Sequence, residues 1–322
     1  MSIGTLIVGL GQIGMGYDLG LNPNTTDVRS HARAFSLHPA FHLLGGVDPA
    51  EQQRRSFECE YRCPSFADVE TALVHVQPEL IVIAVPTPAH GETLRRVLMQ
   101  SRPVAVLCEK PLSYDVEEAR AMVQACADQG TRLFVNYMRR SDPGVVEVKR
   151  RLGSGEIDSP VKGVAWYSKG FIHNGSHFFN LLEYWLGGMV DAQILAAGRL
   201  WDGSDPEPDV RVSFERGTVV FLAAREEEFS HYTVELVAPN GRLRYENGGK
   251  QIDWQPARPD PKLGRYTVLA DDMEIIECGM NRYQWYVADQ LAAALEGKEA
   301  RFCDGDEALR TLESLKTIIE KR

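Results

Sequence analysis

A short apolar run followed at once by three spaced glycines restricts the fold of this chain more than any other feature. Residues Leu6 to Val8 are typical of a strand buried on both faces of a parallel sheet. The motif G-x-G-x-x-G then follows as Gly9, Leu10, Gly11, Gln12, Ile13 and Gly14. Its first glycine allows a tight turn, its second lets the backbone approach a pyrophosphate, and its third allows close packing of the next helix. The stretch therefore predicts a dinucleotide site that uses backbone N–H groups at a helix start.

A second predicted strand, Phe41 to Val47, ends at Asp48, whose carboxylate can accept hydrogen bonds from a ribose diol. Asp48 follows Gly14 by 34 residues, whereas about 20 are usual. Residues Tyr17 to Arg29 have the composition of a loop, and helical periodicity begins only near Ser30. We therefore expect an insertion between the glycine turn and its helix. An ordinary turn without a ligand is the alternative, and the combination of strand, glycines and aspartate favours the dinucleotide site.

Size and composition indicate a soluble protein with a substantial core. The 322 residues suffice for two domains, and 44% hydrophobic with 25% charged residues is ordinary for a globular chain. The net charge of −10, without a dense basic cluster, argues against a nucleic-acid surface. No apolar run is long enough to span a bilayer, so no membrane association is expected.

The six cysteines show no spacing typical of a metal site, because Cys59 and Cys63 have no second pair or nearby histidine. No metal is therefore expected. Cys108 and Cys126 lie in apolar runs and read as core residues. This usage, with a first strand where a signal peptide would stand, predicts a cytoplasmic protein.

Strand and helix signals alternate through the first 140 residues, which predicts a doubly wound parallel sheet. The further strands are expected at 79–85, 104–108 and 133–135. Helices are expected at 49–57, from Ser65 onward, at 88–98 with Thr87 as cap, and at 115–128. Ligands of such a sheet bind at the carboxyl ends of its strands.

The pattern changes past Arg140, where a series of strand candidates joined by tight turns predicts a mostly antiparallel open sheet. Helices are expected at 143–152, at 176–186 and twice near the C-terminus, and strands at 161–167, 192–197, 210–214, 218–223, 232–237 and 242–245. The pair Asn240-Gly241 is a strong hairpin signal. The expected fold is thus α/β plus α+β, with a Rossmann domain at 1–138 and a substrate-binding and oligomerisation domain at 139–322.

The segment Glu109-Lys110-Pro111-Leu112 follows a buried strand, so Lys110 is expected at the cofactor edge of the sheet. A lysine there can bind a substrate hydroxyl and stabilise the alkoxide-like charge that develops as hydride leaves carbon. Glu109 could orient it. The chemistry alone leaves open a surface Glu-Lys pair at a turn, which would contribute little.

Several motifs taken together resemble the Gfo/Idh/MocA dehydrogenases, the relatives of glucose–fructose oxidoreductase and inositol dehydrogenase. They occur in that family's order and cover nearly the whole chain. Besides the glycine motif they are Gly46-Val47-Asp48-Pro49, Pro86-Thr87-Pro88-x-His90, Glu109-Lys110-Pro111-Leu112, Met138-Arg139-Arg140, Gly175-Ser176-His177, Trp185-Leu186-Gly187-Gly188 and Asp304-Gly305 with Ala308-Leu309.

The resemblance implies an NAD-dependent oxidoreductase with Lys110 and His177 as catalytic groups. His177 would take the hydroxyl proton, a task that suits an imidazole near neutral pH; without the resemblance, a histidine beside Phe178 would read as a core residue. The implied cofactor contacts beyond the glycine motif and Asp48 are Pro86, Thr87, Pro88, His90, Glu109 and Lys110.

The chain departs from the family where an aspartate usually supports this histidine. Position 173 is a histidine and position 180 an asparagine, so neither carries a fixed negative charge. His173 could join the proton relay, another group could replace the aspartate, or the site could be inactive. His173, Asn174, Asn180 and Tyr184 remain candidates for relay or substrate contacts.

The leading hypothesis is an enzyme that transfers a hydride between NAD and a secondary alcohol or ketone of a sugar, polyol or nucleotide-sugar. NADP is disfavoured because its 2′-phosphate would lie beside Asp48, although Arg54 or Arg55 could offset this. Two alternatives stay open: a catalytically silent NAD-binding regulatory protein, and an NAD-dependent glycosidase that oxidises its substrate transiently. The expected partners are a small carbohydrate-like molecule and a second copy of the chain in a homodimer or homotetramer.

Overall fold

Two units form the chain in the computed structural model, which describes residues 2–22 and 25–321. The first comprises Met1–Ser141 and Asn281–Arg310, and the second comprises Asp142–Met280 and Thr311–Arg322. The C-terminal residues from 281 to 310, which the sequence analysis placed with the second domain, thus lie in the first unit. Within the described residues no helix combines the length and the apolar character needed to cross a bilayer.

The first unit is a six-stranded parallel sheet in the order β3-β2-β1-β4-β5-β6. This order reverses direction between β1 and β4, as in dinucleotide-binding folds. The strands are β1 (Ile3–Val8), β2 (Phe41–Val47), β3 (Ser65–Phe66), β4 (Leu80–Ile83), β5 (Ala105–Cys108) and β6 (Arg132–Val135). The predicted parallel Rossmann sheet is confirmed.

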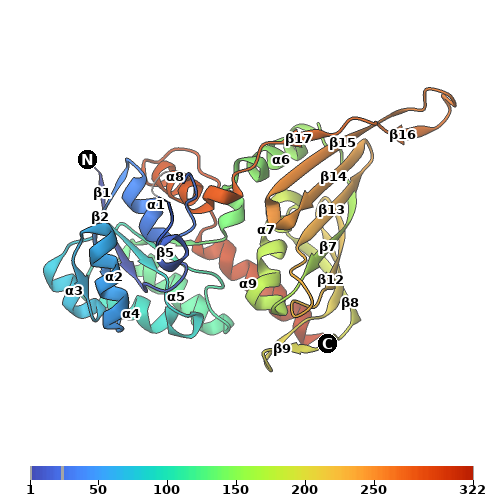
Figure 1. Cartoon of the computed structure of the whole chain (residues 1–322). Helices are drawn as coiled ribbons and strands as arrows, with labels where there is room; N and C mark the ends of the chain where they lie inside the picture. The colour runs from blue at the N-terminus through green and yellow to red at the C-terminus, as the bar shows by residue number, and fades with distance from the viewer. Residues whose placement is uncertain (1, 23–24, 322) are drawn as a thin grey trace. The chain divides into compact units, whose positions relative to one another are not determined.

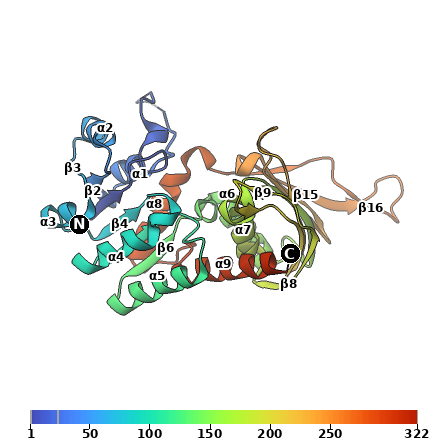
Figure 2. The same cartoon turned by 90° about the horizontal axis from the view of Figure 1, so that it is seen from below.

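Helices cover both faces of this sheet (Figures 1 and 2). They are α1 (His31–Leu37), α2 (Glu51–Tyr61), α3 (Val69–His75), α4 (His90–Gln100), α5 (Val116–Gln129) and α8 (Tyr283–Leu295). The apolar side chains Phe35, Phe57 and Val287 of α1, α2 and α8 share one core with the central strands. Figure 2 shows α4 and α5 on the opposite side of the sheet from α1 and α2.

Three helix starts differ from the prediction, each for a local reason. The Asp48 carboxylate accepts the Ala50 N–H and turns the chain, so α2 begins at Glu51 rather than at residue 49. Residues Ser65–Phe66 pair with β2 instead of opening a helix, and Asp68 caps α3 through the Thr71 N–H. Thr87 makes no side-chain cap, because Thr87–Ala89 forms a 3₁₀ turn that precedes α4.

The second unit is a nine-stranded sheet in the order β16-β15-β14-β13-β7-β12-β11-β8, with β17 paired to β15. The strands are β7 (Val161–Tyr167), β8 (Met189–Ala196), β11 (Asp209–Phe214), β12 (Gly217–Ala223), β13 (Thr233–Ala238), β14 (Gly241–Glu246), β15 (Gln251–Pro259), β16 (Thr267–Leu269) and β17 (Glu274–Ile276). A separate two-stranded sheet is formed by β9 (Leu200–Trp201) and β10 (Asp205–Pro206).

Most pairs in the large sheet are antiparallel, as predicted, and the parallel pair β7–β12 is the exception. The Asn240-Gly241 hairpin joins β13 to β14. The strands β15 to β17 were not anticipated in the sequence. Three helices cover one face of the sheet (Figure 1): α6 (Pro143–Ser154), α7 (Ser176–Leu186) and the C-terminal part of α9 (Gly305–Glu320).

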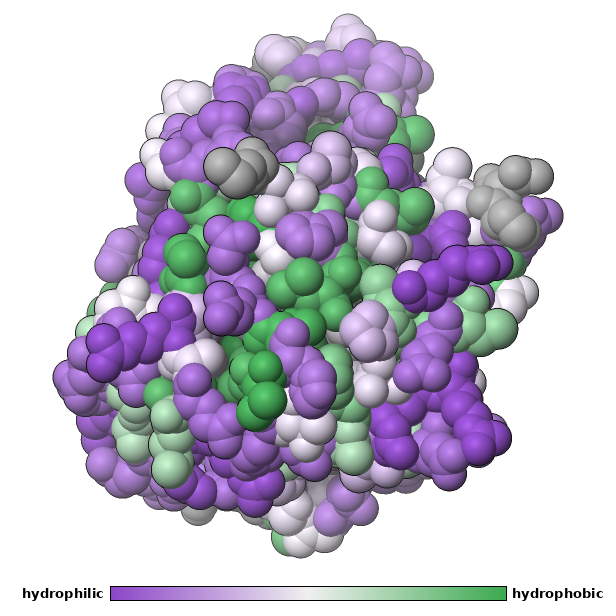
Figure 3. Space-filling model, turned by 90° about the vertical axis from the view of Figure 1, so that its left-hand side faces the viewer, coloured by the Kyte–Doolittle hydropathy of each residue, from purple (hydrophilic) through white to green (hydrophobic). Residues whose placement is uncertain are grey.

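In the view of Figure 3, apolar side chains gather near the middle of the surface and hydrophilic side chains surround them. Single exposed apolar residues such as Val74 and Met99 contribute to the surface of the first unit. Such scattered residues are normal for a folded domain.

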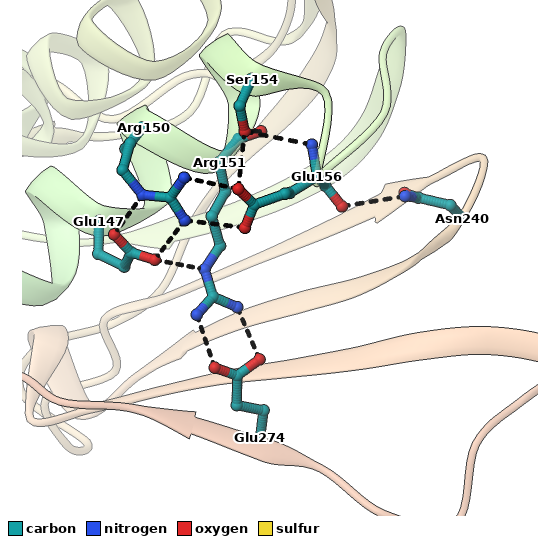
Figure 4. Close-up of polar contacts among 7 residues, drawn as sticks. All are labelled: Glu147, Arg150, Arg151, Ser154, Glu156, Asn240 and Glu274. Carbon is teal, nitrogen blue, oxygen red and sulfur yellow. Dashed lines mark hydrogen bonds and ion pairs between the residues drawn. The ribbon is translucent and has the colours of Figure 1, made fainter.

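A network of arginines and glutamates fastens the end of α6 to the large sheet (Figure 4). Arg151 contacts Glu274 of β17 through two hydrogen bonds, of 2.7 and 2.6 Å, and contacts Glu147 at 2.8 Å. Arg150 joins Glu147 to Glu156. Hydrogen bonds from Arg150 and Arg151 lower the pKa of Glu147 to about 2. Ion pairs organised in this way stabilise more than isolated surface pairs do.

We expect Arg151→Ala to lower the free energy of unfolding at pH 7 by about 1 kcal/mol. The Glu147 carboxylate stabilises the fold fully above its unfolded pKa, roughly 4.3, and this contribution declines as the pH falls through that value toward about 2. The difference between the variant and the wild type should therefore shrink between pH 7 and roughly pH 3. Urea unfolding at both pH values measures it. Arg55→Ala, which removes an exposed pair with Glu51, is the control and should change little; equal losses in both variants would contradict the prediction.

Candidate functional site

The three motif glycines occupy three different environments in the first unit. Gly9 has φ +99°, and a Cβ there would lie 2.6 Å from the Ala84 carbonyl group. A Cβ on Gly14 would lie 2.0 Å from the Gly9 carbonyl oxygen. A Cβ on Gly11 would meet no atom within 4 Å, so this residue borders open space. The first and third glycines thus serve the turn itself, and the second leaves room for a ligand.

The expected insertion interrupts the helix after the glycine turn, and the helix then resumes in register. In an uninterrupted α-helix the carbonyls of residues 13 and 14 would accept the N–H groups of residues 17 and 18. Here Ile13 and Gly14 accept the N–H groups of His31 and Ala32, fourteen positions later. Without these fourteen residues Asp48 would follow Gly14 by 20 residues, which matches the usual spacing of about 20.

Two contacts fix the end of the insertion, of which residues 23 and 24 lie outside the described part. The buried Asp18 carboxylate accepts the N–H and the hydroxyl of Ser30, both at 2.7 Å. Val28 is also buried, and its N–H donates to the Asn281 carbonyl while its own carbonyl accepts the Gln284 N–H. The inserted segment is therefore tied to the start of α8 within the same unit.

Asp48 follows β2, as predicted, and its two carboxylate oxygens accept backbone N–H groups. Oδ2 accepts the Leu10 N–H at 2.9 Å and Oδ1 accepts the Ala50 N–H at 2.8 Å. Each carboxylate oxygen has a second lone pair, which leaves capacity for ribose hydroxyls. Arg54 donates to the carbonyls of Asp48 and Pro49, both at 2.8 Å, so its guanidinium is held by the backbone.

A cavity of about 930 Å³ lies along the carboxyl edge of the parallel sheet, within the first unit. Its volume lies in the range of ligand sites. Predicted cofactor residues that line it are Gly9, Gly11, Gln12, Ile13, Asp48 and Pro86. Among the residues that the structure describes, its lining does not include Gly14, Thr87, His90, Glu109 or Lys110. The open space at Gly11 and the carboxylate of Asp48 fit a dinucleotide.

The Glu109-Lys110 segment follows β5, and Glu109 lies in a polar cluster. Its Oε1 contacts His31 Nε2 and the Asn136 side-chain amide, both at 2.7 Å. His90 is completely buried, and its two ring nitrogens contact the carbonyls of Val85 and Leu112. Burial lowers the His90 pKa, although both carbonyls favour the charged ring. His90 thus joins the end of β4 to the loop that carries Lys110.

His177 lies in the second unit, at the second position of α7, and its side chain is 6% exposed. A π-helix, Gly170–Gly175, precedes α7 and fills the short span after β7. Helical turns of this type occur often at functional sites. Two buried carboxylates hold it: Asp205 accepts the His173 N–H at 2.7 Å, and Glu207 accepts the Gly170 N–H at 3.1 Å.

Asp205 is a buried acid of the second unit that binds backbone and not a histidine ring in the contacts described. It contacts the backbone of the π-helix at Ile172 and His173. Burial raises the pKa of Asp205, while these backbone hydrogen bonds oppose the shift. The carboxylate therefore shapes the segment that leads into α7.

The four weaker candidates of the second unit have distinct surroundings. The His173 ring stacks on Trp201, with ring centroids 5.0 Å apart, and the Asn174 amide donates to the Ser168 carbonyl. The Asn180 amide donates to the Thr311 hydroxyl of α9 at 3.0 Å, which gives it an anchoring contact. Lys149 lies over the Tyr184 ring, 5.3 Å from its centroid. Their roles toward a substrate stay predictions.

Several site residues escaped the sequence analysis. The cavity is also lined by Tyr17, Ala67, Asp68, Val69, Ala89, Glu92, Thr93 and Arg96. Residues Ala67 to Val69 directly follow a strand, and this position would have predicted a place at the ligand edge of the sheet. The signal was missed because β3 was predicted as part of a helix. No motif or spacing in the sequence indicates a functional role for four further polar residues, Asp205, Glu207, His31 and Asn136. In the described chain, no group of three or more His, Cys, Asp or Glu side chains could hold a metal ion.

The family model described as "Oxidoreductase family, NAD-binding Rossmann fold", Gfo/Idh/MocA, matches residues 3–137. Residues 3–137 therefore belong to the Gfo/Idh/MocA oxidoreductase family. The resemblance inferred from the sequence motifs is confirmed for this region, which contains the glycine turn, Asp48 and Lys110. The description of the family model names an NAD-binding fold, which agrees with the predicted cofactor.

Curated relatives match about a third of the chain. Inositol 2-dehydrogenase of Mycolicibacterium smegmatis is 38% identical over 100 residues, which are 31% of this chain and 28% of that protein. The scyllo-inositol 2-dehydrogenase (NAD(+)) of Bacillus subtilis is 33% identical over 93 residues, or 29% of this chain and 25% of that protein. The chain thus matches less than a third of the length of these relatives.

Solved structures match the fold of the whole chain. The WlbA dehydrogenase from Bordetella pertussis, crystallised with NADH and UDP-GlcNAcA, gives a TM-score of 0.76 at 18% identity and covers 100% of this chain and 96% of that one. UDP-N-acetylglucosamine 3-dehydrogenase GnnA from Acidithiobacillus ferrooxidans gives 0.74 at 15% identity, covering 99% and 97%. At these identities the likeness shows the fold alone, and it confirms the predicted fold class.

The environments of the glycines predict opposite outcomes for two alanine substitutions. Gly11→Ala should fold normally, because its methyl group enters open space, but bind NAD at least tenfold more weakly because that space is where the pyrophosphate would approach. Gly14→Ala should destabilise the first unit, because its Cβ would overlap the Gly9 carbonyl. Calorimetric titration with NAD and thermal unfolding distinguish the two. Unchanged NAD affinity in Gly11→Ala would show that the ligand does not use this turn.

Proposed function

We propose that this protein is an NAD-dependent dehydrogenase that oxidises a secondary alcohol of a polyol, sugar or nucleotide-sugar, or reduces the matching ketone. The observation that carries the proposal is the cavity of the first unit, with Asp48 at its edge, in a region of an NAD-binding oxidoreductase family. The substrate class is supported by the inositol dehydrogenases among the relatives and the UDP-sugar dehydrogenases among the structural neighbours.

The cofactor would be held by the turn from Gly9 to Ile13 and by the carboxylate of Asp48. NAD, when bound, supplies a hydride acceptor or donor. NADP is disfavoured because its extra phosphate would meet the charge of Asp48. The guanidinium of Arg54 is held by the backbone carbonyls of Asp48 and Pro49, and Arg55 pairs with Glu51.

Lys110 is proposed to hydrogen-bond the reacting oxygen and to stabilise its negative character. His177 is proposed to take the hydroxyl proton during oxidation and to return it during reduction. The π-helix before His177, held by Asp205 and Glu207, would orient the start of α7 without the usual aspartate. His173 is the candidate for passing the proton onward.

A panel of inositols, sugars and UDP-linked amino sugars, assayed by NADH formation with NAD and in parallel with NADP, tests this function. Oxidation of at least one compound, faster with NAD, is the expected result. Tight NAD binding without any turnover would instead support the silent regulatory protein. The absence of an aspartate at His173 and Asn180 favours that alternative. Release of sugar without net NADH would support the glycosidase.

Lys110→Ala should lower kcat by about 10²–10⁴-fold, because the reacting oxygen loses its cationic donor. NAD affinity should stay within about twofold, since Lys110 lies outside the lining of the described cavity. Steady-state kinetics and calorimetric NAD titration measure both. Lys298→Ala, an exposed lysine of the same unit that pairs with Glu296 at the surface, is the matched control. Near-normal turnover of Lys110→Ala would remove this residue from the mechanism.

We also propose that a second copy of the chain covers the open face of the large sheet, opposite α6 and α7. This face carries exposed apolar side chains, among them Val237 of β13 and Ile275 of β17. Burying such a face in a symmetric pair would remove it from water. A cytoplasmic location is part of the same proposal, since Cys108 and Cys126 lie as free thiols in the core.

A further inference from the structure

His31 is a buried histidine that neither the glycine motif nor the proposed reaction accounts for. It is the first residue of α1, where the helix resumes after the insertion, and its side chain is 0% exposed. Its Nε2 lies 2.7 Å from Oε1 of Glu109. Its Nδ1 has no hydrogen-bond partner among the described residues. The single polar contact of this ring is thus the carboxylate that precedes Lys110.

Glu109 connects His31 to Lys110. Its side chain is 12% exposed, and its Oε1 also accepts the Asn136 amide at 2.7 Å. Its Oε2 accepts the backbone N–H of Lys110 at 3.3 Å. The carboxylate therefore contacts the backbone of the residue whose amine is proposed to act on the substrate.

The surroundings of Glu109 favour its ionised form. Burial would favour the neutral acid, but the hydrogen bonds from His31 and from the Asn136 amide, together with the charge of Lys110, lower the Glu109 pKa. The other titratable groups that face it are His90 of α4, Cys108 of β5 and Tyr283 of α8. Their charged forms are disfavoured by burial, so His31 and Lys110 are the partners that matter.

We propose that His31 is a positioning residue of the dehydrogenase, which holds the Glu109 carboxylate ionised and oriented so that Glu109 fixes Lys110. This inference rests on the proposed function. The hydrogen-bond pattern assigns the imidazole proton to Nε2, since Nε2 faces a carboxylate and Nδ1 has no acceptor in the described chain. A neutral donor on Nε2 suffices for this role, and a glutamine amide reaches a similar position.

The insertion explains why such a histidine stands at this point. Helix α1 continues the glycine turn through the bonds of Ile13 and Gly14 to residues 31 and 32. His31 thereby takes the place that residue 17 would have in an uninterrupted helix. The helix that continues from the glycine turn thus carries, at its first residue, the side chain that contacts Glu109.

The test compares His31→Ala with His31→Gln, using two readouts. In His31→Ala, kcat should fall about tenfold, and the acid limb of its pH profile should move upward by about one unit, because the ionised Glu109 loses a donor. The NAD dissociation constant should stay within about twofold. The Glu109 carboxyl resonance, followed by ¹³C NMR and assigned by its absence in Glu109→Gln, should titrate at higher pH in His31→Ala. His31→Gln should restore most of both properties.

His38→Ala is the matched control, because His38 is a second buried histidine, just past the other end of α1, and contacts the Ala40 N–H. It should leave the Glu109 titration and the pH profile unchanged, even if it lowers stability. An unchanged titration and profile in His31→Ala would overturn the proposal, as would a His31→Gln variant that behaves like alanine. If wild type oxidises none of the panel, the proposed function fails, and the NMR titration still decides the role of His31 toward Glu109.

Discussion

The close approach between Gly14 and the Gly9 carbonyl oxygen constrains the rest of the first unit. A single methyl group at position 14 would lie 2.0 Å from that oxygen, so the turn can close only with glycine there. Closing it brings the Leu10 N–H to the Asp48 carboxylate and leaves the space beside Gly11 open. One steric requirement thus sets the edge of the cavity, the position of the acid and the direction of the helix that follows.

The sequence could predict the parallel sheet because its strands are short apolar runs that end in glycine, proline or polar residues. It predicted the insertion for a similar reason, since glycine, proline and asparagine interrupt helical periodicity between Tyr17 and Arg29. Residues 65 and 66 show the limit of such reasoning. Their pairing with β2 depends on contacts distant in the chain, and the local pattern before Asp68 is that of a helix start. Tertiary pairing decides such short strands.

The residues of the candidate site also fall into two groups, those that the sequence could predict and those that it could not. The glycines, Asp48 and Pro86 were predictable because their chemistry depends on a fixed spacing from a strand, and Gly9, Gly11, Asp48 and Pro86 line the cavity. His31, Asn136, Asp205 and Glu207 were not, because each acts through a partner far away in sequence. Asp205 illustrates this: it lies 32 residues beyond the segment whose N–H groups it binds. A family pattern that expects an acid at position 173 gives no indication of one at 205.

Helix α1 continues in register after the insertion, so the geometry of the site does not depend on the length of the inserted segment. The carbonyls of Ile13 and Gly14 accept the N–H groups of His31 and Ala32, and these bonds set the rotation of α1 about its own axis. The length of the inserted loop does not change that rotation. A loop of another length or sequence would leave the same helical face against the sheet. The insertion is therefore a place where new surface can evolve on the nucleotide-binding edge while the architecture beneath it remains constant.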